Sequence, residues 1–224
     1  SALHIGLQLL GVQKDEFVLM PNVTFVASAN AISYVGAEPI LIDIDPHTWQ
    51  MNLEALEEFL IANCRLDRSN TLLHKKTGRV IRALMIVHVQ GNMCDMDKLL
   101  SICKQYKLPI LEDAAEALGS KYKNKYAGTI GDIGCFSFNG NKIMSTGGGG
   151  MIVSSNEQYI RRAKHLTTTA KRDSETYFHD EVGYNYRLVN VLAAIGVAQL
   201  EQLDGFILSK INVANYYRQT LEGV

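Results

Sequence analysis

Two polar side chains bracket an otherwise apolar and glycine-rich part of the chain. Asp113 closes the apolar run LPILED, and Lys142 follows the turn SFNGN and precedes IMSTGGGG. Most lysines are solvated surface charges, but a lysine in so glycine-rich and charge-poor a region can act as an amine nucleophile. An aspartate at a strand end commonly caps the next turn. Each residue has a structural explanation by itself, and the two together allow a chemical one.

The chemical explanation pairs the amine of Lys142 with the carboxylate of Asp113. Pyridoxal phosphate needs a lysine to hold it covalently and an acid beside its pyridinium nitrogen. The acid keeps that nitrogen protonated, so that the ring accepts electrons when a substrate loses a proton. The sequence therefore predicts Lys142 and Asp113 as catalytic residues, provided that folding brings them to opposite ends of one flat ring.

Apolar strands alternate with helices along the chain. Strands are expected over 17–20, 39–44, 80–89, 108–111, 135–138 and 151–154, and helices over 1–10, 24–35, 52–63, 95–107 and 156–166. Strands that are apolar on both faces and separated by helices are typical of a mostly parallel sheet covered on both sides. Ligands of such sheets bind at the carboxyl ends of the strands. Asp113 occupies such an end, and so do the turns NVTF and HVQGN.

Composition narrows the class of protein. The 224 residues are 47% hydrophobic and carry a formal net charge of -1. This near-neutral balance argues against a dedicated nucleic-acid binder. The absence of an apolar run of about 18 residues predicts no membrane span. Four widely spaced cysteines predict reduced core thiols and a cytoplasmic protein, and the scattered histidines predict no metal site.

Several spaced motifs resemble one family. They are MPNVTFVASANAISYVGAEPILIDID, EDAAEALGS, FSFNGNK, GGGGMIV and YNYRLVNVLAAIGVAQLEQL. In this order they cover nearly the whole chain and resemble the DegT/DnrJ-type sugar aminotransferases, which are fold-type I pyridoxal-phosphate enzymes. The resemblance implies an α/β fold: a three-layer sandwich with a mostly parallel sheet, the large domain of an aspartate-aminotransferase-like enzyme.

The resemblance also implies roles at the ring end of the cofactor. Lys142 matches the Schiff-base lysine, and Asp113 matches the acid under the pyridine nitrogen. Phe25 matches the aromatic residue that stacks on the ring, with plain core packing as its alternative. Glu116 stands where many relatives carry Gln or His, so its role stays open between hydrogen bonding behind the cofactor and contact with the substrate.

At the phosphate end the resemblance implies four further cofactor-binding residues. Ser137 matches a hydroxyl that holds the phosphate. Ser1 and Ala2 match the end of a turn whose backbone N–H groups bind phosphate at a helix start. Asn185 in YNYR matches a residue that reaches the phosphate of a partner subunit, which implies a homodimer with shared active sites.

The implied activity is transamination of a nucleotide-linked sugar. The turn NGNK resembles members that act on a UDP-4-keto-6-deoxy-N-acetylhexosamine, with glutamate as amino donor. A lysine at 142, rather than the histidine of related dehydratases, favours transamination. Two alternatives stay open: a non-catalytic regulator or scaffold that retains the fold, and another fold-type I reaction such as that of a lyase or desulfurase.

The domain organisation expected from the sequence has two parts. Residues 1–189 are expected to form the cofactor-binding large domain, truncated at its N-terminus. Residues 190–224 are expected to form one long helix that leads to an absent C-terminal small domain. The polar stretch 167–180 is expected to be a surface loop.

Overall fold

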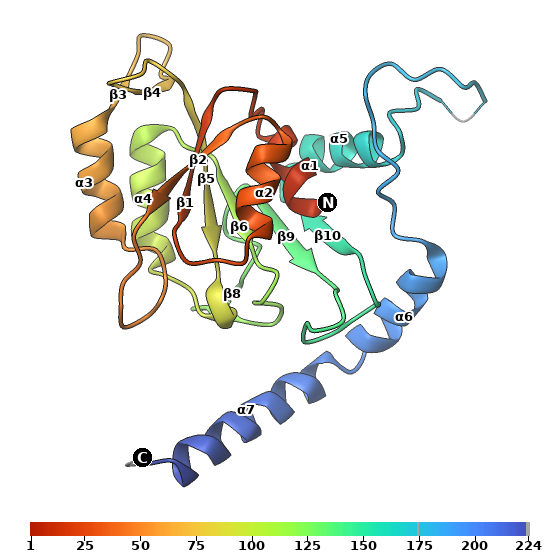
Figure 1. Ribbon diagram of the computed structural model, residues 1–224. Helices are drawn as coiled ribbons and strands as arrows, with labels where there is room; N and C mark the ends of the chain where they lie inside the picture. The colour runs from red at the N-terminus through yellow and green to blue at the C-terminus, as the bar shows by residue number, and fades with distance from the viewer. Residues whose placement is uncertain (174, 223–224) are drawn as a thin grey trace.

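A six-stranded sheet forms the centre of the molecule. The computed structural model describes residues 1–173 and 175–222 (Figure 1). The strand order is β10-β9-β6-β5-β1-β2, and every neighbouring pair is parallel except β9 and β10. The strands are β1 (Phe17–Pro21), β2 (Glu38–Ile42), β5 (Ile81–Val87), β6 (Ile110–Asp113), β9 (Ile133–Ser137) and β10 (Gly150–Val153). The predicted mostly parallel sheet is confirmed.

Helices cover both faces of this sheet. One face carries α1 (Ala2–Leu9), α2 (Ala27–Tyr34) and α5 (Glu157–Thr167), and the other carries α3 (Leu53–Asn63) and α4 (Met96–Tyr106) (Figure 1). Successive residues of a strand point to opposite faces. In β6, Ile110 belongs to the core beneath α3 and α4, whereas Leu111 belongs to the core beneath α1 and α2. The chain is thus the three-layer α/β sandwich that the sequence predicts.

Side-chain caps fix where several helices begin. The Asp95 carboxylate accepts hydrogen bonds from the backbone N–H groups of Asp97 and Lys98 at the start of α4. Asn52 accepts from the N–H of Ala55 at the start of α3 in the same way. These bonds satisfy N–H groups that have no partner within the helix.

Glycine allows α1 to lie directly on the sheet. A Cβ atom at Gly6 would stand 2.5 Å from Leu111 Cδ1 and 3.3 Å from Cys135 Sγ. The bare backbone of α1 therefore rests on β6 and β9. This close approach brings the first residues of α1 to the end of the sheet where β10 begins (Figure 1).

The cysteines are buried, as the prediction of reduced core thiols requires. Cys64, Cys94, Cys103 and Cys135 are all free and buried. Burial raises the pKa of the Cys64 thiol to about 11 and that of Cys103 to about 12. Both side chains are therefore neutral thiols at physiological pH.

Two short hairpins do not appear among the predicted elements. The first pairs β3 (Cys64–Leu66) with β4 (Leu72–His74), and the second pairs β7 (Lys121–Tyr122) with β8 (Lys125–Tyr126). A short 3-10 turn, η1 (Val89–Gly91), follows β5. Strands of two or three residues are too short to show an alternating pattern in the sequence.

The prediction of one long C-terminal helix is wrong. The structure has α6 (Asn190–Leu200) and α7 (Leu203–Thr220), bent by 59° at the break. Each helix meets a different part of the body. Gln199 of α6 accepts the N–H of Ser145, and Ile207 of α7 packs against Gly119. The bend allows both contacts, and α7 then extends away from the sheet (Figure 1).

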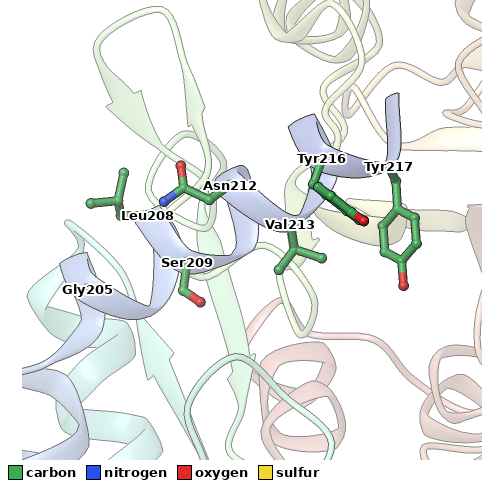
Figure 2. Close-up of a pocket in the computed structure, with 7 residues that line it drawn as sticks. All are labelled: Gly205, Leu208, Ser209, Asn212, Val213, Tyr216 and Tyr217. Atoms are coloured by element: carbon green, nitrogen blue, oxygen red, sulfur yellow. The ribbon is translucent and has the colours of Figure 1, made fainter. Parts of the chain in front are cut away.

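Helices α6 and α7 leave many apolar side chains exposed. Val191 is 72% exposed and Leu208 is 59% exposed. A shallow hollow on α7 is lined by residues of that helix alone, among them Val213 and Tyr216 (Figure 2). In the described part of the chain, no single helix is long and apolar enough to span a membrane. The bent pair α6 and α7 has the required length and composition only when the two helices are taken together.

Candidate active site

Asp113 lies at the carboxyl end of β6, where an open parallel sheet binds its ligands. Its side chain is almost fully buried. Ser28 Oγ donates to Asp113 Oδ2 at 2.7 Å, and the N–H of Ala115 donates to Oδ1 at 3.2 Å. Burial raises the pKa of Asp113, while these two hydrogen bonds and electrostatic interactions with His88 and Lys142 partly oppose the rise. A cation placed against this carboxylate would favour its ionised form.

Lys142 lies in the turn that follows β9. Its backbone N–H donates to the carbonyl of Asn139 at 3.0 Å, which closes the turn. The side chain is 16% exposed, and Nζ is 3.4 Å from Glu116 Oε1. The charge of Lys142 acts on the Asp113 carboxylate. The predicted amine therefore lies near enough to the predicted acid to lower the pKa of the acid, and their catalytic roles stay predictions.

Glu116 bridges Lys142 and the turn after β5. Its Oε2 accepts the backbone N–H of Gln90 at 2.8 Å, while its Oε1 faces Lys142. Gln90 has φ 55° and ψ 23°, and Gly91 has φ 80°, so two successive left-handed residues aim this N–H at the carboxylate. The structure places Glu116 on the lysine side of the site. A role in cofactor binding stays a prediction.

Phe25 stands free of the core. Its side chain is 74% exposed, so the core-packing alternative is wrong. The predicted helix 24–35 begins only at Ala27, which leaves Thr24 and Phe25 in the preceding turn. The Phe25 carbonyl accepts the N–H of Ser28, the residue that binds Asp113. An exposed aromatic residue therefore stands one turn from Ser28, the hydrogen-bond donor to the candidate acid, and its stacking role stays a prediction.

The phosphate-binding residues predicted at two distant places in the sequence converge. Ser1 precedes α1 and Ala2 begins it, and the first N–H groups of a helix have no partner within it. Ser137 ends β9 and pairs with Gly150 of β10. A Cβ atom at Gly150 would stand 3.7 Å from Ala2 Cβ. The helix start and the end of β9 therefore meet at one corner of the sheet.

Asn185 lies between two tyrosines that pack against α1. Tyr184 and Tyr186 both pack near His4 of α1, at 5.0 and 6.1 Å between ring centroids. Gln8 Nε2 also donates to the Tyr184 hydroxyl. Alternate residues of an extended segment project to opposite sides. The exposed Asn185 therefore projects away from the body of its own chain, and its contact with a partner subunit stays a prediction.

His165 is less isolated than the sequence suggests. The ligand atoms of His165, Asp180 and Glu181 lie within 4.8 Å of one another. His165 Nε2 is 2.8 Å from Asp180 Oδ1, and the guanidinium of Arg162 pairs with Glu181. The Arg162 guanidinium therefore already supplies a positive charge to this cluster.

Three polar groups in or behind the site are not predicted from the sequence: Ser28, the N–H of Gln90, and Glu112. Ser28 lies in the small-residue run VASANA, where a hydroxyl looks like helix filler. Its spacing of four from Thr24 is the signal that could have revealed it, because Thr24 Oγ1 and Ser28 Oγ are 2.8 Å apart. Glu112 stands next to Asp113 in the run LPILED, but successive residues of a strand point to opposite faces, so the two carboxylates have different surroundings.

We expect Ser28→Ala to destabilise the full-length protein by about 2 kcal/mol at neutral pH, because a buried carboxylate loses a hydrogen-bond donor. Urea unfolding measures this difference. Ser33→Ala is the matched control, since Ser33 is exposed on the same helix and donates only to the carbonyl of Ala29. Equal effects of the two substitutions would contradict the prediction.

The sheet, the acid at the end of β6 and the lysine after β9 define an aspartate-aminotransferase-like α/β domain of fold type I. The comparison with protein families narrows this class. The profile of the DegT/DnrJ/EryC1/StrS aminotransferase family matches residues 1–224, and the chain belongs to that family.

Individual relatives agree with this assignment. The chain is 41% identical over 223 residues to "GDP-perosamine synthase" of Escherichia coli O157:H7, with 100% of this chain and 57% of the relative covered. It is 34% identical over 226 residues to "UDP-4-amino-4,6-dideoxy-N-acetyl-beta-L-altrosamine transaminase" of Campylobacter jejuni, with 99% of this chain and 55% of the relative covered. The chain thus spans little more than half the length of these curated relatives.

A solved structure shows the same fold. A DegT DnrJ EryC1 StrS aminotransferase from Brucella abortus matches with a TM-score of 0.88 and 27% identity. The match covers 100% of this chain and 57% of that chain. The resemblance and the fold class that it implied are confirmed.

Proposed function

We propose that the protein is a pyridoxal-phosphate-dependent aminotransferase that converts a nucleotide-linked keto sugar to an amino sugar, with glutamate as amino donor. One observation carries this proposal. A buried carboxylate, Asp113, and a largely buried amine, Lys142, share one site at the carboxyl edge of the sheet. Membership of an aminotransferase family supports the same reading.

The residues present fit this cofactor. The ionised form of the buried Asp113 carboxyl group would be stabilised by a cationic partner, and a protonated ring nitrogen is such a partner. The start of α1 and Ser137 offer N–H and hydroxyl donors to a phosphate, and the exposed Phe25 offers a stacking surface. When bound, the cofactor supplies an electron sink.

The protein residues would divide the work as follows. Asp113 would keep a proton on the ring nitrogen. Nζ of Lys142 would hold the cofactor and would move the proton at the α-carbon of the amino donor as a general acid and base. Nucleotide contacts remote from the chemistry would supply binding energy.

The carrier of the sugar is the finer part of the proposal. The resemblance of the NGNK turn to members of the family implies a UDP-linked 4-keto-6-deoxy-N-acetylhexosamine. The two relatives named above carry GDP in one name and UDP in the other. The class that they share is a nucleoside-diphosphate sugar, and we propose this class as the substrate, with UDP and GDP as competing carriers.

A two-step experiment tests the function. The full-length protein is loaded with pyridoxal phosphate and mixed with glutamate, and the loss of the absorbance of the lysine-bound cofactor is followed. The aminated protein is then mixed with a panel of UDP- and GDP-linked keto sugars, and the acceptor is the sugar that restores the absorbance. A protein that keeps the fold but shows no absorbance change with any donor would favour the alternative of a non-catalytic scaffold.

We also propose a cytoplasmic homodimer with shared sites. The four free, buried cysteines support a reducing compartment. The exposed apolar side chains of α6 and α7 support an interface, or a contact with a further small domain to which residues 190–224 would lead. The outward direction of Asn185 supports a contribution to the partner's site.

Complementation tests the shared site. Lys142→Ala and Asn185→Ala are each expected to be nearly inactive as separate homodimers. Co-expressed, they form a mixed dimer in which one site carries both substitutions and the other carries neither. We expect activity to return in the isolated mixed dimer, to about half of the wild-type value per dimer. No recovery would contradict sharing of the site between subunits.

A further inference from the structure

The sheet buries a second carboxylate directly behind the candidate site. Glu112 precedes Asp113 in β6, and its side chain projects to the opposite face of the sheet. His88 follows the neighbouring strand β5. The side chains of Glu112 and His88 are both fully buried, and Glu112 Oε2 is 2.8 Å from His88 Nε2.

Glu112 accepts four hydrogen bonds. Besides His88, the donors are the backbone N–H groups of Gly128 at 2.8 Å, Ile130 at 2.7 Å and Gly131 at 2.5 Å. Burial alone would raise the pKa of Glu112, but the bonds from His88, Gly131 and Gly128 outweigh it and lower the pKa. Glu112 is therefore a buried anion at neutral pH.

The backbone donors to Glu112 belong to the segment that leads into β9. That strand ends at Ser137, and the turn beyond it carries Lys142. A Cβ atom at Gly134 would stand 1.9 Å from the Gly128 carbonyl oxygen, so this segment lies tightly against the strand. Glu112 thus joins the strand that carries the acid to the strand that leads to the lysine.

His88 contacts both acids of β6. Its backbone N–H donates to the Asp113 carbonyl at 3.1 Å, and its ring faces Glu112. A carboxylate only accepts, so we assign a proton to Nε2. The other ring nitrogen, Nδ1, is buried and has no hydrogen-bond partner among the described residues. Glu112 is therefore the group that orients this ring.

Three groups from separate elements influence the Asp113 carboxylate from nearby. Ser28 of α2 donates a hydrogen bond, and electrostatic interactions with His88 after β5 and Lys142 after β9 act to lower the pKa of Asp113. The charge of Asp113 in turn raises the pKa of Cys135 in β9, although burial is the main cause of that rise. Of these three groups, His88 is the one that is hydrogen-bonded to Glu112.

We propose that Glu112 and His88 form a positioning pair: the buried Glu112 anion holds the His88 ring and the end of β6, so that Asp113 faces the cofactor's ring nitrogen as an anion. This inference rests on the proposed function. Neither residue of the pair needs to touch cofactor or substrate, and both act through Asp113.

The test compares Glu112→Gln and His88→Asn with Asp132→Asn in the full-length protein. Asp132 is the matched control, because its Oδ2 accepts the N–H of Ile110 and so ties the same two strands at their other end. Purely structural loosening should appear in all three variants. Only the first two variants should alter the charge at Asp113.

The first readout is a pH titration of the absorbance of the lysine-bound cofactor. A ring nitrogen that has lost its proton withdraws fewer electrons from the lysine nitrogen, which then titrates at higher pH. We expect the midpoint to rise by about one pH unit in His88→Asn, which loses the imidazole that acts on Asp113, and to rise in the same direction in Glu112→Gln, because the His88 ring is no longer held in place. We expect no change in Asp132→Asn.

The second readout is urea unfolding of the cofactor-free protein, in which all three variants should be less stable. An unchanged midpoint in both Glu112→Gln and His88→Asn, with Asp132→Asn equally destabilised, overturns the inference and leaves the proposed function intact. A wild-type protein that forms no bond to the cofactor overturns both. If Glu112→Gln does not fold, His88→Gln provides the same comparison.

Discussion

Replacing Lys142 with alanine is expected to slow transamination in the full-length protein by a factor on the order of 10⁴, the upper range for a residue that transfers a proton in the transition state. The same substitution removes the covalent bond to the cofactor, so the absorbance of the lysine-bound form should be absent. Single-turnover mixing with glutamate measures the rate, and absorbance spectra measure the bond. Both losses follow from one missing amine.

Lys76→Ala provides the control for this loss. Lys76 is exposed in the turn between β4 and β5 and lies outside the candidate site. We expect wild-type rates and spectra from that variant. Lys142→Arg keeps a positive charge beside Glu116 but has no free amine, so it should be as slow as Lys142→Ala. A Lys142→Ala protein that transaminates at the wild-type rate would rule out the proposed site.

Asp113→Asn should lower the rate by a factor on the order of 10³, again within the range that correctly placed proton chemistry contributes. Asparagine has nearly the same shape and keeps an oxygen for the N–H of Ala115. It has no charge to hold a proton on the ring nitrogen. Asp97→Asn is the control, because Asp97 is exposed on α4 and pairs with Lys123. Rates are measured with glutamate at saturation.

The same Asp113→Asn substitution should stabilise the cofactor-free protein at neutral pH. The pKa of Asp113 is raised in the folded state, chiefly by burial. A carboxyl group with a raised folded pKa disfavours the folded state as pH climbs from the unfolded value through the folded value. Asparagine removes this penalty. Urea unfolding at acid and at neutral pH should show a gain only at the higher pH, and a loss of stability there would contradict the assignment.

Much of the sheet was predictable, because its strands are buried on both faces. Runs such as IRALMIV contain no polar alternation, which is typical of a central parallel strand, and the acid at the end of β6 is visible as a break in such a run. The predicted strand 108–111 ends too early, because the hydrogen-bonded pairing with β5 continues through Glu112 and Asp113. A hydrophobicity pattern ends a strand at its first charged residue, even where that residue is buried.

Other features have no local signal. The break between α6 and α7 falls at Glu201 and Gln202, with neither proline nor glycine, and only contacts with distant residues explain it. The bonds of Ser28 and Glu112 join residues far apart in the chain, so no spacing rule finds both partners. The meeting of α1 with Ser137 likewise depends on sheet order, which the resemblance implied and the individual residues did not.

The reversed direction of β10 bears on how the chain assembles. Antiparallel neighbours need no crossover helix, so β9, the turn with Lys142 and β10 form one continuous hairpin from 133 to 153. Closing a short loop costs little entropy, whereas the parallel contacts of β6 with β5 and β9 enclose longer loops. During refolding, the hairpin with the amine should therefore become protected from hydrogen exchange before the strand with the acid. During synthesis, the turn that carries Lys142 would then form before the strand that carries Asp113 is in place to bind a cofactor.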